Sequence, residues 1–429
     1  MTERRRVVVT GLGIISPAGS GRRQYWSGLL SGRSFVRAID RFDVSSYPTR
    51  IAASVDDSSL PDDLRPYDRI TRFGLAAADD AIADAQLSRE CSISASRRRG
   101  VVMASGMGTY GHQEIFAACS NAAAGEDFDW EAFHVLVRRH RVARAAERRT
   151  PGSVSARVAQ RAGFRGPVMS VMTACAAGSQ AIGDAARWIR DGRADVVLAG
   201  GADSELYPMG LASFCLLRAL SRRNDAPEQA SRPFAQGRDG FVIGEGGAAL
   251  VLEDLRHATD RGAHIYAELA GFGSASDAYR VTDPHPEGMG ASRAMTAALQ
   301  EARVSAEEVG YINAHGTSTV ANDRIETAAV KRVFGARAGR IPISSTKSMI
   351  GHLTVAAGAA EAVATVLSLA EQTVHPTINH DESDPECDLD YVPNVARQVT
   401  IDLALTNSFA FGGQCASALF SRYEERARA

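Results

Sequence analysis

Short apolar segments alternate with amphipathic segments along most of the chain, and this alternation limits the possible folds more than any other feature. The apolar segments have the length of strands, and the others repeat apolar residues at the spacing of one helix face. Strands that alternate with helices predict the α/β class. Strands are expected at Arg6–Thr10, Gly100–Ala104, Val168–Met172, Asp195–Ala199, Ala248–Leu252, Ile265–Phe272, Tyr311–Ala314 and Ile401–Thr406, and helices at Arg72–Ala85, Ser179–Asp191, Gly290–Glu301 and Ala356–Ala370.

A weak internal repeat divides the chain into two halves. We expect these halves, residues 1–259 and 260–429, to pack together as one pseudo-symmetric unit. The similar segments are Val7–Gly13 with Ala267–Gly273, the strand and helix around Cys175 with Ile343–Ser345 and Ala356–Gly358, and Asp195–Gly201 with Leu403–Gly413.

Composition excludes several classes of protein. The chain has 429 residues, of which 45% are hydrophobic, and a net charge of −2, so no overall basic field favours nucleic acid. No apolar run approaches the roughly 18 residues of a membrane span. The six cysteines form no C-x-x-C pair, so zinc-ribbon and thioredoxin-like sites have no support. Six scattered cysteines in a chain of this length indicate a reducing, cytoplasmic location.

One glycine motif resembles a nucleotide site. Residues 106–111 fit the pattern G-x-G-x-x-G after an apolar strand. The motif lies far from the first strand, and no second strand ending in an acidic residue follows it. We therefore expect no dinucleotide cofactor.

Cys175 stands where an apolar strand passes into an Ala-rich helix. Backbone N–H groups and the positive end of the helix dipole gather at such a helix N-terminus, and they stabilise a thiolate and lower its pKa. The alternative is a small buried core thiol. The alanines and glycine beside Cys175 leave room for a substrate, so we take it as a candidate nucleophile.

Two histidines follow apolar strands downstream of Cys175. His315 and His352 each lie beside glycine and among Ser and Thr residues. Glu326 lies eleven residues after His315, and Lys347 lies five residues before His352. A hydrogen-bonded network of these four side chains would fix the tautomers and charges of the histidines. Structural histidines are the alternative.

A glycine-rich turn ends the last clear strand expected. The turn lies within residues 406–413. If it lies near a thiolate, it could give a backbone N–H to an oxyanion hole. A second segment, Arg138–Arg149, is strongly basic. It is expected to be a solvated helix, a docking patch for an acidic partner, or a helix at a subunit interface.

Taken together, these motifs resemble the β-ketoacyl-acyl-carrier-protein synthases, the ketosynthases of the thiolase superfamily. The resemblance spans the whole chain. It is carried by residues 5–11, 231–234, 238–246, 313–317, 345–352 and 407–413.

The resemblance implies a five-layered αβαβα fold from two similar halves, usually in a dimer. It places the catalytic Cys-His-His triad on Cys175, His315 and His352, with Lys347 and Glu326 as the supporting lysine and glutamate. The implied oxyanion hole uses the N–H groups of Cys175 and Phe411. The implied gate and acyl pocket include Phe409, Ala410, Phe411 and Met107. No metal, flavin or nucleotide is implied.

The subfamily features are mixed. Residues 322–329 and 385–393 resemble the α subunits of bacterial type II polyketide ketosynthases, whereas residues 173–178 are closer to fatty-acid elongating synthases. Because Cys175 is present, the chain does not resemble the inactive chain-length-factor subunit. Ala410 replaces the usual glycine of the gating turn, and its Cβ disfavours a positive φ there.

The expected reaction is a decarboxylative Claisen condensation. An acyl chain on Cys175 is extended by a malonyl unit held on an acyl carrier protein, with no further cofactor. The expected partners are that carrier and either a second copy or a chain-length-factor-like subunit. The alternatives are fatty-acid elongation, acyl transfer without condensation, and a non-catalytic scaffold subunit. Chain length, starter unit and cognate carrier are not determined by the sequence.

Overall fold

The computed structural model describes residues 4–89, 92–106, 119–120, 122–123, 127–139, 150 and 152–424. Their main sheet has the order β11-β10-β14-β15-β9-β1-β8-β7-β5-β6, with β2 added beside β1. Its strands are β1 (Val7–Ser16), β2 (Gly19–Ser20), β5 (Arg99–Ser105), β6 (Val168–Val171), β7 (Val196–Asp203), β8 (Gly246–Asp254), β9 (Ala267–Ser276), β10 (Tyr311–Asn313), β11 (Ile343–Ser344), β14 (Leu403–Phe409) and β15 (Gln414–Arg422). Two small sheets pair β3 (Arg37–Ala38) with β4 (Ile51–Ala52), and β12 (Thr373–Val374) with β13 (Arg397–Gln398).

The strand order reads the same from both ends. Counted outward from the centre, β1, β8, β7, β5 and β6 of the first half match β9, β15, β14, β10 and β11 of the second. The directions match as well: the three outer strands of each half run parallel, and the two inner pairings are antiparallel. The halves meet where β1 pairs with β9 over two residues. The division between residues 259 and 260 itself stays a prediction.

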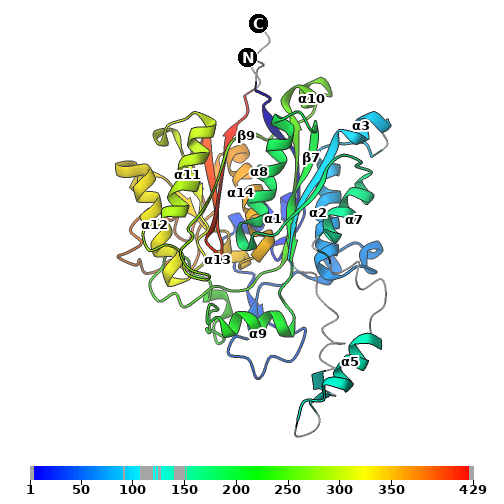
Figure 1. The fold of residues 1–429 in the computed structure, drawn as a ribbon. Coiled ribbons are helices and arrows are strands. Elements are labelled where there is room, and N and C mark those ends of the chain that lie inside the picture. The colour runs from blue at the N-terminus through cyan, green and yellow to red at the C-terminus, as the bar shows by residue number, and fades with distance from the viewer. Residues whose placement is uncertain are drawn as a thin grey trace.

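The molecule has five layers, which Figure 1 shows side by side. Helices α2 (Arg69–Asp84) and α7 (Ser153–Ala162) cover the outer face of the first half-sheet, and α11 (Met289–Ala302) and α12 (Val320–Phe334) lie outside the second. Helices α8 (Ala177–Arg190) and α14 (Ala357–Glu371) lie between the two half-sheets and contact strands of both. The other α-helices within the described residues are α1 (Arg22–Leu30), α3 (Ile93–Arg97), α5 (Trp130–Arg139), α9 (Pro208–Leu216), α10 (Leu255–Asp260) and α13 (Lys347–Ile350).

The two central helices cross at a pair of glycines. A Cβ on Gly178 would lie 2.7 Å from the backbone nitrogen of Ala359 on α14, and a Cβ on Gly358 would lie 2.7 Å from that of Ser179 on α8. No side chain fits at such distances, so only glycine allows the helices to approach this closely. This contact brings the beginnings of the two central helices together in the middle of the molecule.

The α/β class and the expected αβαβα layering are confirmed, and all eight expected strands are present. Several strand boundaries differ from those expected, and the largest difference is at the first strand. We expected the first strand to end at Thr10, but β1 continues to Ser16. Gly11 and Gly13 lie inside the strand because α2 packs directly on them: a Cβ on Gly13 would lie 1.9 Å from the carbonyl oxygen of Ala77.

A single segment of the described residues, Thr354–Glu371, is long and apolar enough to cross a membrane. It comprises a 3₁₀ turn and α14, and 89% of it is buried inside the protein. Burial of this kind is what the core helix of a globular protein shows.

Candidate active site

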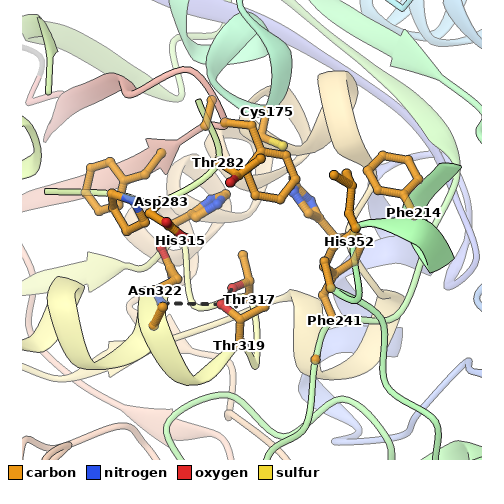
Figure 2. A pocket seen from close by; sticks show the side chains of 18 of the residues that line it. Cys175, Phe214, Phe241, Thr282, Asp283, His315, Thr317, Thr319, Asn322 and His352 are labelled. Atoms are coloured by element: carbon orange, nitrogen blue, oxygen red, sulfur yellow. Dashed lines mark hydrogen bonds between the residues drawn. The ribbon is translucent and has the colours of Figure 1, made fainter. Parts of the chain in front are cut away.

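Cys175 lies in a 3₁₀ turn, η3 (Ala174–Ala176), that connects β6 to α8. The sequence predicted this strand-to-helix corner, but the α-helix begins two residues later than the cysteine. Ala174 has a φ of 47°, in the left-handed region, and this sharp bend turns the thiol toward the second half. The Sγ atom lies 3.1 Å from Nε2 of His352 (Figure 2).

The expected low pKa of Cys175 is not found. Burial raises the pKa of the thiol to about 12, and the positive charge of Lys347 offsets only part of this effect. The thiol is therefore neutral near pH 7. Cys175 is half-buried, and the cost of desolvating its thiolate outweighs what the helix N-terminus contributes.

His315 and His352 come from separate segments and meet at the thiol. His315 follows β10, and His352 follows α13. Their ring centroids are 5.3 Å apart with nearly perpendicular planes. Burial lowers the pKa of both imidazoles well below the usual value, and the charge of Lys347 lowers it further. Both histidines are therefore neutral near pH 7, and His352 forms a neutral hydrogen-bonded pair with Cys175.

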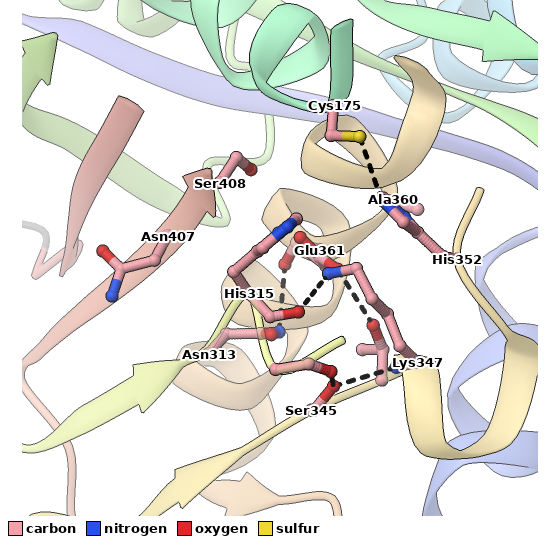
Figure 3. A network of polar contacts seen from close by, with 12 residues as sticks. Cys175, Asn313, His315, Ser345, Lys347, His352, Ala360, Glu361, Asn407 and Ser408 are labelled. Atoms are coloured by element: carbon pink, nitrogen blue, oxygen red, sulfur yellow. Dashed lines mark hydrogen bonds and ion pairs between the residues drawn. The ribbon is translucent and has the colours of Figure 1, made fainter. Parts of the chain in front are cut away.

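Lys347 is fully buried, and its partner is Glu361, which the sequence analysis did not identify. The Nζ atom donates to Oε1 of Glu361 and, at 2.5 Å, to the backbone carbonyl of His315 (Figure 3). Glu361 projects from α14 into this site. Burial raises its pKa to about 7, although Lys347 favours the charged form. The pair thus ties the backbone of His315 to the central helix.

Glu326 lies on α12 and contacts the backbone of the His315 loop rather than the side chains of the expected network. It makes no hydrogen bond to Lys347; its carboxylate accepts from the backbone N–H groups of His315 at 2.9 Å and Gly316 at 2.8 Å. Asn407 Nδ2 lies 3.3 Å from the same carboxylate. Burial raises the pKa of Glu326 to about 7. Glu326 therefore fixes the backbone of the His315 loop. In place of one network of four side chains, Lys347 with Glu361 and Glu326 with Asn407 form two networks, which meet at the backbone of His315.

A cavity of about 380 Å³ lies in front of the cysteine and the two histidines. Its walls combine aromatic rings with hydroxyl and amide groups (Figure 2). Such a mixture suits a ligand with an apolar chain and a few polar groups. The residues that line the cavity include Phe214, Phe241, Thr317, Thr319, Asn322, Thr354, Phe409, Ala410 and Phe411.

The turn between β14 and β15 closes one side of this cavity. Ala410 N donates to the carbonyl of Gln414 at 2.8 Å, and Gly412 N donates to the carbonyl of Val281 at 2.6 Å. The N–H of Phe411, between them, has no hydrogen-bond acceptor among the described residues. Ala410 does not adopt a positive φ, so its methyl group causes no backbone strain in this conformation.

Two predictions fall outside the described residues. Met107, expected at the acyl pocket, is one of them. Of the basic segment Arg138–Arg149, only the first two residues are described, at the end of α5. Both predictions therefore stay predictions. Among the described residues, no group of three or more His, Cys, Asp or Glu side chains is arranged to hold a metal ion.

A five-layered fold with a half-buried cysteine and two buried histidines at one cavity defines an acyl-transferring enzyme of the thiolase type. Comparison with known sequences gives the family. Residues 4–258 match the family described as beta-ketoacyl synthase, N-terminal domain, and residues 266–381 match beta-ketoacyl synthase, C-terminal domain. The chain belongs to the beta-ketoacyl synthase family, which confirms the resemblance found in the sequence.

Similar proteins come from two kinds of pathway. The chain is 43% identical to 3-oxoacyl-[acyl-carrier-protein] synthase 2 of Coxiella burnetii, over 98% of this chain and 99% of that protein. It is 42% identical to the tetracenomycin polyketide synthase ketoacyl synthase alpha subunit of Streptomyces glaucescens, over 98% of each.

Solved structures share the fold over the same length. A beta-ketoacyl synthase from Burkholderia phymatum has a TM-score of 0.87 and 36% identity, over 98% of this chain and 100% of that one. A ketosynthase in complex with its type II PKS acyl-carrier protein and bound to the hexaketide has a TM-score of 0.86 and 37% identity, over 98% of this chain and 100% of that one.

Proposed function

We propose that this β-ketoacyl-acyl-carrier-protein synthase extends an acyl chain held on Cys175 with a malonyl unit from an acyl carrier protein, in bacterial type II polyketide biosynthesis. The observation that carries the proposal is the 3.1 Å contact between Cys175 Sγ and His352 Nε2, with His315 beside it, at one cavity. This arrangement suits covalent acyl transfer followed by carbanion chemistry.

In the first half-reaction, Cys175 takes the acyl group from the carrier thioester. The thiol is neutral at rest, so its proton moves to Nε2 of His352 as Sγ attacks the carbonyl carbon. The backbone N–H groups of Cys175 and Phe411 hold the oxyanion that forms. The bond to the pantetheine sulfur then breaks, and the proton on His352 passes to that leaving sulfur.

In the second half-reaction, malonyl on its carrier enters the same cavity. His315 and His352 are neutral imidazoles, and each donates a hydrogen bond to the malonyl thioester carbonyl from the ring nitrogen that faces the cavity. For His352 this requires that, after acylation, its ring proton moves from Nδ1 to Nε2 by exchange with solvent. The bond to the carboxylate breaks, CO₂ leaves, and an enolate remains. Its carbon attacks the acyl carbonyl on Cys175, the new C–C bond forms, and the released Cys175 sulfur takes up one proton.

The proposal includes the partners. The substrates are carried on the phosphopantetheine of an acyl carrier protein, and the enzyme uses no other cofactor. The ketosynthase named above is itself in complex with an acyl-carrier protein, which supports this partner. The ishigamide ketosynthase/chain length factor, at 36% identity and a TM-score of 0.84, supports a heterodimer with a similar subunit. A homodimer is the alternative. We place the enzyme in the cytoplasm.

Fatty-acid elongation is the second candidate function, because the synthase of Coxiella burnetii is as similar as the polyketide subunit. The partner distinguishes the two. A polyketide enzyme should copurify with a chain-length-factor-like subunit and release chains with several unreduced keto groups. A fatty-acid enzyme should be active alone and accept saturated acyl chains.

The test is ¹⁴CO₂ release from labelled malonyl-carrier in the presence of an acyl-carrier, for the wild type and Cys175→Ala. We expect release coupled to a β-ketoacyl product in the wild type, and no product in the variant. Acyl transfer without CO₂ would identify a non-condensing acyltransferase. If the wild type formed neither an acyl thioester on Cys175 nor CO₂, the chain would be a scaffold subunit instead.

A further inference from the structure

Two chain segments in this molecule pass through a 3₁₀ turn into a central helix, and they match residue for residue. The turn η3 leads into α8, and the turn η7 (Thr354–Ala356) leads into α14. Ala174 and Thr354, the first residues of the turns, have φ angles of 47° and 48°. The crossing glycines of the two helices follow at the same spacing. Val355 therefore takes in the second half the position that Cys175 takes in the first.

The strand ends that face the two turns match as well. Leu198 on β7 pairs with Val251, which pairs with Gly11 of β1. Leu405 on β14 pairs with Leu419, which pairs with Gly271 of β9, so the two leucines are in equivalent registers. Ser204 and Phe411 each lie six residues beyond these positions. The N–H groups of Val355 and Ser204 thus form a second copy of the pair of donors that we assign to the oxyanion hole.

Asp203 fills this second pair of donors. Its Oδ2 accepts from the N–H of Val355 at 3.1 Å and from the hydroxyl of Thr354 at 2.5 Å, and its Oδ1 accepts from the N–H of Ser204 at 2.9 Å. The side chain is 1% exposed. Gly106 covers it so closely that a Cβ there would lie 2.5 Å from Oδ1. A carboxylate thus occupies the place that the substrate oxyanion takes in the first half.

The correspondence also explains why only one of the two sites is open. By the same register, Ala410 takes in the first half the position of Asp203. Its methyl group has no oxygen to offer, so the donors of the first half stay available to a ligand. The second half carries a threonine and a valine at its turn, and its donors are permanently occupied.

The occupied site lies next to a catalytic residue. Thr354 is β-branched and is held at a positive φ, which costs free energy unless its surroundings enforce it. Two residues before it is His352, whose own N–H donates to Val242 at 2.7 Å and whose carbonyl accepts from Gly244 at 2.9 Å. The segment between Gly351 and Val355 is therefore held on one side by the Val242–Gly244 strand and on the other by Asp203.

We propose that Asp203 is a positioning residue, which fills the second donor pair, keeps Thr354 in its left-handed conformation and thereby holds His352 against Cys175. The inference rests on the proposed function, because it acts through His352. It assigns work to a buried carboxylate that the reaction steps themselves do not use.

The test compares Asp203→Ala with Asp68→Ala. Asp68 is a matched control, because it caps α2 with the same kinds of bonds, from the N–H and hydroxyl of Thr71, away from the cavity. We expect Asp203→Ala to lower kcat for condensation about 100-fold with KM for malonyl-carrier nearly unchanged, since a displacement of about 1 Å has effects of that size. Asp68→Ala should keep the wild-type kcat.

Two further measurements separate positioning from a general loss of structure. Formate should enter the vacated site and restore much of the kcat of Asp203→Ala, whereas chloride at the same ionic strength should not. In a His352→Ala background, the Asp203→Ala change should lower the remaining acylation rate less than twofold, because its effect passes through His352.

Specific results would overturn the inference. It is wrong if Asp203→Ala lowers kcat no more than Asp68→Ala does, if formate raises the melting temperature without restoring the rate, or if the two changes act additively. If Asp203→Ala does not fold, Asp203→Asn takes its place in the test. A wild-type kcat in Asp203→Asn would likewise overturn the inference. Failure of the proposed function is recognised separately, because the wild type would then release no CO₂, or Cys175→Ala would still condense.

Discussion

At the scale of single residues, the two active-site histidines have different neighbours, and this separates their roles. His352 contacts the thiol directly, whereas His315 faces His352 and is held through its backbone by Lys347 and Glu326. We expect His315→Ala to acylate Cys175 at close to the wild-type rate but to release CO₂ at least about 100-fold more slowly. His352→Ala should slow both steps. Single-turnover acylation and ¹⁴CO₂ release measure the two separately.

An equal loss of acylation in both variants would contradict this division. The control is Phe241→Leu, which removes the ring edge that packs on His352 but leaves its imidazole in place. That variant should keep both half-reactions within a few-fold of the wild type.

The buried pair of Lys347 and Glu361 makes a second prediction. Removing one partner leaves the other charge buried without compensation, which typically costs about 3–5 kcal/mol. We expect Glu361→Leu to lower the free energy of unfolding by about that amount. Adding Lys347→Met should recover part of the loss, because neither charge of this pair is then left buried without its partner. Urea unfolding of the two single variants and the double variant gives the comparison.

The ion pair predicts that Lys347 and Glu361 are energetically coupled. A double variant less stable than Glu361→Leu would contradict this coupling. Activity provides a further check. The double variant should remain folded and yet condense poorly, because His315 has lost the bond to its carbonyl.

The sequence could identify Cys175, His315, His352 and Lys347 because each stands beside glycine or hydroxyl residues in a short motif. Glu361 could not be identified in this way, since it is one acidic residue in a long apolar helix, and only the packing of α14 brings it to Lys347. The neutral state of the thiol was missed for a related reason. Burial depends on the whole fold, whereas helix position is a local property.

At the scale of elements, we expect the turn between β14 and β15, which lines the cavity, to control substrate entry. The bond from Gly412 N to Val281 ties the turn to the neighbouring loop, and Ala410 restricts its backbone. We expect Ala410→Gly to raise the rate of malonyl entry or broaden the range of acyl chains accepted. Its cost in stability should be roughly 0.5–1 kcal/mol, from added freedom of the unfolded chain.

Stopped-flow acylation with acyl-carriers of increasing length measures this effect. Gly335 offers a contrast away from the cavity: a Cβ there meets no atom within 4 Å, although its φ is 53°. Gly335→Ala should change stability and leave substrate range alone. Unchanged kinetics and range in Ala410→Gly would show that the turn does not limit entry.

Glu253 connects β8 with β1 and α10 and makes a pH-dependent prediction. Burial raises its pKa, but hydrogen bonds from His257, Arg261 and Thr10 outweigh this and hold the pKa at about 2, below the usual 4.5. A carboxyl with a lowered folded-state pKa stabilises the fold fully above pH of about 4.5, and this contribution is lost as the pH falls toward 2. The difference corresponds to about 3 kcal/mol.

Urea unfolding between pH 6 and 2 should therefore show a smaller pH dependence for Glu253→Gln than for the wild type, by about 3 kcal/mol across that range. The exposed ion pair of Glu268 with Arg6 is the control, and Glu268→Gln should leave the slope nearly unchanged. An unaltered slope in Glu253→Gln would show that its hydrogen bonds do not favour the charged form.

The strands and long helices were predictable because their apolar periodicity is local. The boundaries at Thr10 and Phe272 were not, because glycines normally indicate turns. In this fold, Gly11 and Gly273 lie inside strands where α2 and α11 rest on the backbone. Two glycines at alternate positions within a strand indicate that a helix packs directly on the strand backbone. They occur in both halves, as Gly11 and Gly13 in β1 and as Gly271 and Gly273 in β9.

At the scale of the whole molecule, the active site depends on how closely the two central helices approach each other. α8 carries the turn with Cys175, and α14 begins just after His352 and carries Glu361, so the crossing at Gly178 and Gly358 sets the distance between the nucleophile and its partners. A side chain at the crossing would have to move backbone atoms rather than a flexible side chain.

This geometry makes the last prediction. In Gly178→Ala, the new Cβ would lie 2.7 Å from Ala359 N and 3.1 Å from the carbonyl of Val355, so the two helices must separate. We expect a loss of stability of about 1–3 kcal/mol, typical of overpacking in a close-packed core. The condensation rate should fall by more than the smaller fraction of folded protein explains, because the 3.1 Å contact between Cys175 and His352 lengthens at the same time.

Gly152→Ala is the comparison, since a Cβ at that position meets no atom within 4 Å. Thermal melting and condensation rates, measured for both variants, distinguish a general loss of stability from a change at the site. If Gly178→Ala lost stability but kept the rate of Cys175 acylation, the two halves would tolerate movement at the crossing. The cysteine and histidine would then owe their contact to the turns η3 and η7, and Asp203 would be its principal support.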